Sequence, residues 1–166
     1  SAHTATFSQR NAHRLRPLFI NQADGAVSGR SRSAIQAGAS MVNDVNALCA
    51  PGALEICADG GIAVCLMHMQ GEPRTMQLEP NYADVVAEVK AYLFDRAQAC
   101  ERAGIAKDGI VVDPGFGFGK NREHNLTLLR NLSVFRDLGY PVLAGLSRKS
   151  VLGKITGQEV VSRVSA

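Results

Sequence analysis

Short apolar runs alternate with longer segments of helical periodicity over most of the chain. Runs of this kind predict buried strands, at Ser40–Val45, Ile62–Met67, Ile110–Asp113 and Pro141–Gly145. Helical periodicity followed by glycine predicts helices that end near Gly38 or cover residues 51–58, about 82–103 and 125–138, with a further helix starting after residue 150. Because the connections are too long for hairpins, we expect an α/β fold of parallel strands with helical crossovers.

The first 33 residues do not follow this pattern. They are rich in Ser, Arg, Gln, Asn and His, and contain one short apolar cluster, Leu18–Ile20. Such a composition buries little apolar surface, so we expect an irregular, loosely packed N-terminal segment (residues 1–33) followed by one folded domain (residues 34–166). An Arg-rich, acid-poor start also resembles an organelle transit segment, but its helical pattern is weak.

Composition and charge exclude several classes of function. Apolar residues make up 46% of the 166 residues and charged residues 20%, as in ordinary globular proteins. Residues 1–33 hold five of the 18 Lys and Arg and one of the 15 Asp and Glu, which leaves a nearly neutral body of 13 basic and 14 acidic residues. No basic stripe predicts nucleic-acid binding, and no apolar run reaches the length of a membrane span.

The four cysteines and four histidines are scattered, without the spacing of a metal site. Cys65 lies inside an apolar run and is most simply a small buried hydrophobic residue. Cysteines of this kind indicate a reducing compartment, and we therefore expect a cytoplasmic protein.

Polar residues stand where each predicted strand ends. Parallel strands open their carboxyl ends on one edge, here called the strand-end rim, which would hold Asn43, Asp44, Met67, His68, Asp113, Ser147 and Lys149. An amide and a carboxylate in one plane suit a flat heterocycle with a guanidine-like edge, such as a pterin. Lys149 could bind the same ring. Each residue also has a plain interpretation, as a turn former or a solvated helix start.

The segment Pro114–Gly119, here called the glycine loop, follows Asp113 and alternates Gly with Phe116 and Phe118. It matches neither nucleotide-binding pattern: Pro114 and Asn121 break the P-loop, and the glycine spacing is not Gly-x-Gly-x-x-Gly. We expect both rings near the mouth of a pocket. The alternative is a simple turn whose Phe side chains fold back onto the core.

Five collinear motifs carry a family resemblance: Gly38–Val45, Pro51–Glu55, Val64–Gly71, Asp113–Lys120 and Ser147–Ser150. Together they resemble the dihydropteroate synthases, pterin-binding TIM-barrel enzymes, from about residue 34 to residue 156. The resemblance implies part of a TIM (β/α)8 barrel, with about four strand–helix units, which is an incomplete barrel. An incomplete barrel would leave apolar edges exposed, and a second copy of the chain in a homodimer could cover them.

The resemblance also implies roles for individual residues. Those matching the pterin pocket are Asn43, Met67, Asp113 and Lys149, with Phe118 and Gly145 as walls. Those matching the side that binds p-aminobenzoate and sulfonamides are Phe116, Ser147 and Arg148. Asp113 and Lys149 would be catalytic. An ungapped match also places Asp24 on the Asp of the family's Val-Asp-Thr strand.

The implied reaction belongs to folate biosynthesis. A transferase would condense 6-hydroxymethyl-7,8-dihydropterin pyrophosphate with p-aminobenzoate, giving dihydropteroate and pyrophosphate. The resemblance implies Mg²⁺ as the cofactor, although the family loop that carries its ligand, two further N-terminal motifs and the C-terminal Arg-x-His motif have no match in the chain. Two alternatives stay open: a pterin-dependent methyltransferase of the same barrel family, and a non-catalytic remnant that binds pterin weakly.

Overall fold

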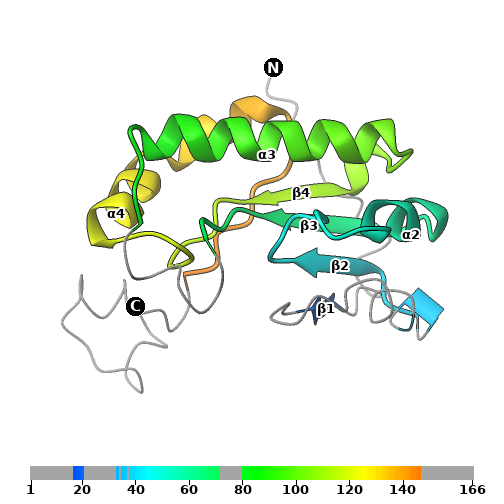
Figure 1. Ribbon diagram of the computed structural model, residues 1–166. Coiled ribbons are helices and arrows are strands. Elements are labelled where there is room, and N and C mark those ends of the chain that lie inside the picture. The colour runs from blue at the N-terminus through cyan, green and yellow to red at the C-terminus, as the bar shows by residue number, and fades with distance from the viewer. Residues whose placement is uncertain (1–16, 21–32, 34, 37, 72–79, 147–166) are drawn as a thin grey trace.

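The computed structural model describes residues 17–20, 33, 35–36, 38–71 and 80–146. A parallel sheet of four strands forms the centre of this part of the chain, in the order β1-β2-β3-β4. The strands are β1 (Pro17–Ile20), β2 (Met41–Asp44), β3 (Ala63–Met67) and β4 (Ile110–Asp113). The parallel α/β architecture predicted from the sequence is therefore confirmed (Figure 1).

Helices connect the later strands. The α-helices are α2 (Ala53–Asp59), α3 (Val85–Arg102) and α4 (Arg122–Arg130), and the 3₁₀ segments are η2 (Lys107–Gly109) and η3 (Leu132–Leu138). Helix α3 begins three residues later than predicted because the Asp84 side chain caps it, accepting hydrogen bonds from the backbone N–H groups of Val86 and Ala87. The single helix predicted for 125–138 is divided in two at Asn131, which ends α4.

The strand predicted at Pro141–Gly145 is present only as a short bridge. Val142 pairs in parallel with Val112, and two backbone bonds of 2.9 Å hold it: Val112 N to Pro141 O, and Leu143 N to Val112 O. The segment thus lies beside β4, as predicted, but with fewer ladder contacts. The helix predicted after residue 150 lies outside the described residues.

Strand β1 was not predicted. It pairs with β2 from Pro17 opposite Met41 to Ile20 opposite Asp44. The expectation of an irregular segment is wrong for these four residues. Hydrogen bonding to the neighbouring strand β2 orders them, and a four-residue cluster is too short to predict such a strand from its own sequence. The boundary drawn at residue 33 stays a prediction.

The hydrophobic core lies between α3 and the sheet (Figure 1). Alternate strand residues face α3, and the buried ones are Val42, Val64, Leu66, Ile110 and Val112. From the helix, Val89, Leu93, Ala97 and Cys100 pack at helical spacing, each 0% exposed. The remaining alternate residues face the other side of the sheet, where the candidate site lies.

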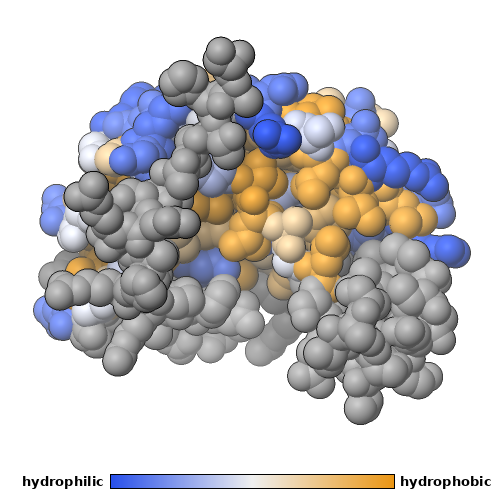
Figure 2. Space-filling view, turned by 180° about the vertical axis from the view of Figure 1, so that it is seen from behind, coloured by the Kyte–Doolittle hydropathy of each residue, from blue (hydrophilic) through white to orange (hydrophobic). Residues whose placement is uncertain are grey.

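Figure 2 shows the molecule from behind, with an apolar area at its centre and hydrophilic residues along its upper margin. Partly buried apolar residues at the edge of the core include Ile35, Val142 and Leu146. A parallel sheet is normally covered on both faces, so an apolar area of this kind is expected where described elements do not cover it. None of the helices in the described ranges combines the length and apolar character that a membrane crossing requires.

Candidate functional site: the strand-end rim

Strand register brings together three of the predicted site residues. Asn43 pairs with Cys65 across β2 and β3, and Met67 pairs with Asp113 across β3 and β4. Cys65 and Met67 are two positions apart, so their side chains point to the same face of the sheet. Asn43, Met67 and Asp113 therefore lie on one face, at the carboxyl ends of three adjacent strands.

Asp113 is buried and held in a fixed orientation. Its side chain is 5% exposed, and its Oδ1 accepts a 2.8 Å hydrogen bond from Gly115 N. Its backbone carbonyl accepts a second bond, 3.0 Å long, from His68 N. Burial, and after it the negative charge of Asp113, raises the pKa of the Cys65 thiol to about 12, so Cys65 is a protonated, small neighbour of the carboxylate.

Asn43 presents a buried amide oxygen that lacks a hydrogen-bond partner among the described residues. Buried polar atoms are nearly always satisfied, because leaving one without a partner costs about 1–3 kcal/mol. An acceptor on the same face as a fixed carboxylate is therefore suited to a ligand that brings its own N–H groups. Ser40 Oγ, before the start of β2, is also without a partner within the described ranges.

Asp44, the next residue, serves the loop instead. Its two carboxylate oxygens accept from Asn46 N at 3.0 Å and from Leu48 N at 2.8 Å. They stabilise a turn in which Ala47 and Leu48 have the left-handed φ values of 49° and 56°. The carbonyl groups of the same two residues accept bonds of 2.9 and 3.0 Å from Arg96.

The electrostatics of Asp44 follow from this position. Burial raises the pKa of Asp44, while its two backbone hydrogen bonds and Arg96 oppose the rise. Asp44 is 0% exposed and belongs to the face of β2 that packs toward α3, so the turn-forming interpretation applies to it.

The glycine loop packs directly on the segment that follows β3. Gly115 (φ 70°) and Gly119 (φ 61°) have left-handed backbones, and a Cβ at either would collide with the carbonyl oxygen of His68 or Gln70. A Cβ at Gly115 would also lie 3.1 Å from the Met67 side chain. These two glycines are therefore required for close approach of the two loops.

The two phenylalanines of the glycine loop differ. Phe116 is 0% exposed and belongs to the hydrophobic core, whereas Phe118 is half-buried. The expectation that both rings lie near a pocket mouth is thus wrong for Phe116, whose ring folds back onto the core. Burial of one ring anchors the loop because it removes a large apolar surface from water.

Lys120 and His68 form a buried polar centre that was not assigned from the sequence. Lys120 is 2% exposed and His68 is 6% exposed, and Lys120 Nζ lies 3.0 Å from His68 Nδ1. Burial, and then the Lys120 charge, lowers the pKa of His68 to about 3, so the imidazole is neutral near pH 7. The only sequence signal was a lysine directly after a glycine loop, and nothing local shows that it is buried.

Aromatic and amide side chains brace this centre. His68 contacts the Tyr92 ring edge-on at 5.0 Å and the tilted Tyr82 ring at 6.0 Å. The Tyr82 hydroxyl donates a 2.8 Å bond to Gly119 O. The Gln70 side chain bonds twice to the backbone of Asn81, at 2.7 and 3.0 Å. These contacts connect the residues around the rim to helix α3 and to the segment that precedes it.

Four further predicted site residues cannot be placed in this geometry. Asp24, Ser147, Arg148 and Lys149 lie outside the described residues. Gly145 is described, partly exposed, in the segment beside β4. Within the described ranges, no group of three or more His, Cys, Asp or Glu side chains is placed to hold a metal ion.

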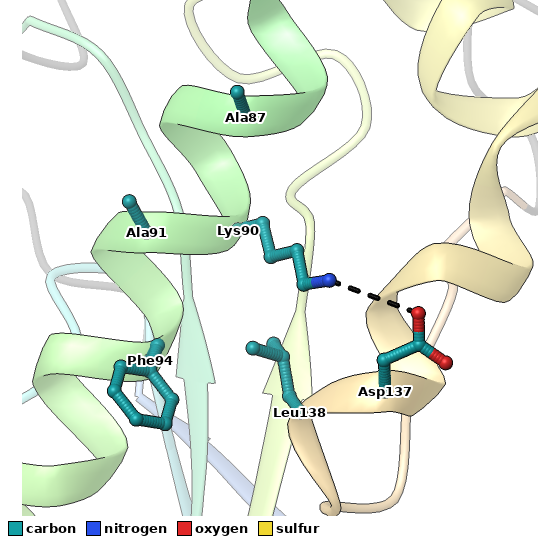
Figure 3. Close-up of a pocket in the computed structure, with 6 residues that line it drawn as sticks. All are labelled: Ala87, Lys90, Ala91, Phe94, Asp137 and Leu138. Atoms are coloured by element: carbon teal, nitrogen blue, oxygen red, sulfur yellow. Dashed lines mark ion pairs between the residues drawn. The ribbon is translucent and has the colours of Figure 1, made fainter.

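A surface pocket lies away from the rim, between α3 and η3. Its volume is about 450 Å³, and its lining residues are Ala87, Lys90, Ala91, Phe94, Asp137 and Leu138. Figure 3 shows the Lys90 ammonium pointing toward Asp137, at 3.7 Å from its Oδ2. Phe94, 44% exposed, stands on α3 beside them. The pocket contains none of the predicted site residues.

Comparison with known proteins places the sequence in a family. The family described as pterin binding enzyme matches residues 26–166. Dihydropteroate synthase of Escherichia coli K12 is 48% identical over 134 residues, covering 81% of this chain and 48% of the relative. That of Haemophilus influenzae is 49% identical over 165 residues, covering 94% of this chain and 60% of the relative.

Solved dihydropteroate synthases share the fold. The Xanthomonas albilineans enzyme in complex with 7,8-dihydropteroate is 46% identical, with a TM-score of 0.77, covering 90% of this chain and 53% of that chain. The Thermus thermophilus enzyme in complex with 6HMPPP is 41% identical, with a TM-score of 0.80 and coverage of 89% and 58%. The Yersinia pestis enzyme in a sulfonamide drug complex is also 41% identical, with a TM-score of 0.79 and coverage of 89% and 52%.

The chain spans about half the length of these relatives, and it corresponds to part of a TIM barrel. The family match begins at residue 26, somewhat before the boundary predicted at residue 33. It extends over most of the chain, and it includes the rim residues of β2, β3 and β4. The chain therefore belongs to the family of pterin binding enzymes.

Proposed function

We propose that this chain carries the pterin-binding part of a dihydropteroate synthase. One observation carries the proposal: the buried Asn43 Oδ1, without a partner among the described residues, lies on the same rim as the fixed Asp113 carboxylate. A pterin edge offers parallel N–H donors that would satisfy both groups. The solved relatives bound to 7,8-dihydropteroate and to 6HMPPP support this choice of ligand.

Orientation of the pterin would come from Asp113 and Asn43 together. The hydrogen bond from Gly115 N fixes the carboxylate plane before the ligand arrives, so little ordering remains to be done on binding. Met67, 4% exposed at the end of β3, would supply an apolar contact to the ring. Phe118 and Gly145 are proposed as walls of the same pocket.

In the proposed reaction, the amine nitrogen of p-aminobenzoate attacks the methylene carbon attached to the pterin ring. The bond from this carbon to the pyrophosphate oxygen breaks, pyrophosphate departs with the electron pair, and the amine loses a proton. Asp113 would stabilise the positive charge that develops on the ring as pyrophosphate leaves. Lys149 would bridge the pterin and the second substrate.

We propose that Ser147 and Arg148 form the side of the site that binds the second substrate, p-aminobenzoate, with Phe116 supporting the loop from the core. A sulfonamide complex of the Yersinia pestis relative supports sensitivity of the complete site to such drugs. We also propose a cytoplasmic location: Cys49, Cys57, Cys65 and Cys100 are free thiols, as a reducing compartment maintains them.

Binding and turnover are expected to separate in the 166-residue chain. The family motifs proposed to hold pyrophosphate and Mg²⁺ have no match in its sequence. Loss of one preorganised charge-stabilising group typically costs about 10²–10³ in rate. We expect pterin binding with negligible conversion of labelled p-aminobenzoate to dihydropteroate; turnover at an ordinary enzymatic rate would contradict this.

The test of the proposed function is a calorimetric titration of the chain with a 6-hydroxymethylpterin. Asp113→Asn keeps the shape but removes the charge, and should weaken binding by about 2–3 kcal/mol through loss of a charge-assisted contact. Asp137→Asn is the matched control, because Asp137 is 72% exposed in the remote pocket. Equal affinity in all three proteins would mean that Asp113 only terminates its strand.

A further inference from the structure

Lys120 joins two loops through a single buried ammonium group. Its Nζ donates to the carbonyl oxygens of Phe118 at 2.9 Å and Gly115 at 3.0 Å, both in the glycine loop. It also lies 3.2 Å from the carbonyl oxygen and 3.0 Å from the Nδ1 of His68, in the segment after β3. Four acceptors from two loops therefore converge on one cation.

This convergence needs a compact charged donor. Charge-assisted hydrogen bonds are about twice as strong as neutral ones, and an ammonium can donate in three directions at once. An apolar side chain of similar length would fill the space but leave inward-pointing carbonyl groups without this donor. The glycines at 115 and 119 allow the two loops to approach closely enough for one ammonium to reach both.

Gly115 links this contact to the candidate site. Its N–H donates to Asp113 Oδ1 at 2.8 Å, while its C=O accepts from Lys120 Nζ at 3.0 Å. The residue that orients the carboxylate is thus itself held by Lys120. A shift of Gly115 would remove this hydrogen bond from the Asp113 carboxylate.

We propose that Lys120 is a positioning residue, which holds the glycine loop in the shape that presents Asp113 to the pterin. Its effect on binding rests on the proposed function, but its effect on the loop does not. Because Nζ donates to Nδ1 of a neutral imidazole, the ring proton of His68 lies on Nε2. Lys120 therefore also selects the His68 tautomer.

The first test measures the loop itself by NMR in Lys120→Met, with Lys90→Met as the matched control on the surface of α3. Amide hydrogen exchange of Gly115 and Gly117 should accelerate at least about tenfold in Lys120→Met while α3 stays protected. The His68 pKa should rise toward its ordinary value, because a nearby positive charge is removed. Unchanged Gly115 exchange and an unchanged His68 titration would overturn the proposal.

If Lys120→Met loses protection throughout α3, it has unfolded globally, and Lys120→Gln is measured by the same criterion. Gln retains a neutral donor but not the ammonium, so faster exchange at Gly115 is again expected. Equal protection at Gly115 in Lys120→Gln and the unsubstituted chain would refute a role for the ammonium.

The second test asks whether Lys120 acts through Asp113. As a single substitution, Lys120→Met should weaken pterin binding about tenfold. In a chain that already carries Asp113→Asn, it should have little further effect. Equal losses in both backgrounds would show that Lys120 does not work through this carboxylate. Absence of pterin binding by the unsubstituted chain would reject the proposed function, while the exchange experiment would still decide the role in the loop.

Discussion

Two asparagines, Asn125 and Asn43, show how differently the two sides of the site are built. Asn125, at the start of α4, is 2% exposed, and both ends of its amide are occupied: Oδ1 accepts from Gly117 N at 2.8 Å, and Nδ2 donates to Lys120 O at 3.2 Å and Asn121 O at 2.6 Å. Asn43, at the end of β2, has an amide oxygen without a partner among the described residues. Asn125 serves the fold, whereas the arrangement around Asn43 is explained if a ligand completes it.

The comparison extends to the neighbouring groups. On the side of the glycine loop, Lys120 donates to the backbone carbonyl groups of Gly115 and Phe118, and Asp113 accepts from the backbone N–H of Gly115. Substitution of Lys120 should therefore disturb the glycine loop first. Substitution of Asn43 should damage ligand binding and leave the fold intact, since a functional group that is unsatisfied in the free protein contributes little to its stability.

The largest expected effect is on pH-dependent stability, through His68. Its pKa is lowered to about 3 in the folded chain from 6.5, so the unfolded chain binds more protons between these values. The contribution of the neutral His68 to the free energy of unfolding is therefore fully present above about pH 6.5. It is lost as the pH drops toward 3, by at most about 5 kcal/mol. Urea denaturation across this range measures it. His68→Gln, which cannot titrate there, should flatten the curve; an unchanged slope would show that other groups dominate.

The next effect is that of Asn125→Leu, which removes the three side-chain hydrogen bonds to Gly117 N, Lys120 O and Asn121 O, while Asn121 O still accepts from Asn125 N. We expect a loss of about 2–4 kcal/mol in the free energy of unfolding. Chemical denaturation would measure it, with Asn131→Leu as the comparison because the Asn131 side chain donates a hydrogen bond to Thr127 O at 2.8 Å. A smaller loss for Asn125→Leu than for Asn131→Leu would contradict the assignment of Asn125 to the fold.

A smaller effect is predicted for Tyr82→Phe. The change removes the 2.8 Å bond to Gly119 O but keeps the ring against His68. One such bond contributes about 0.5–1.5 kcal/mol. Thermal unfolding should show a modest drop, and exchange at the glycine loop should rise less than in Lys120→Met. A stability equal to that of the unsubstituted chain would remove Tyr82 from the bracing of this loop.

Much of the fold could be predicted because its signals are local. Buried strands at Met41–Asp44 and Ile110–Asp113, and the helix at Val85–Arg102, follow from apolar runs, periodicity and turn residues. Parallel order follows from the length of the connections. Strand β1 could not be predicted, because Pro17–Ile20 is held by pairing with β2 rather than by its own pattern.

The candidate site shows the same division. Placing Asn43, Met67 and Asp113 at strand ends was enough to expect them on one rim, since register and alternation are general properties of parallel sheets. The separate fates of Phe116 and Phe118, and the burial of Lys120, depend on which parts of the chain pack on the loop. Such contacts between distant segments leave no trace in a local pattern.

The central claim is that the strand-end rim is built to bind a pterin through Asn43 and Asp113. Its most direct test is one paired measurement on Asn43→Leu: the free energy of unfolding by chemical denaturation and the affinity for a 6-hydroxymethylpterin by calorimetry. We predict stability within about 0.5 kcal/mol of the unsubstituted chain, or slightly higher, together with binding weaker by about 1–2 kcal/mol. Unchanged pterin affinity, or a loss of stability as large as that of Asn125→Leu, would contradict the claim.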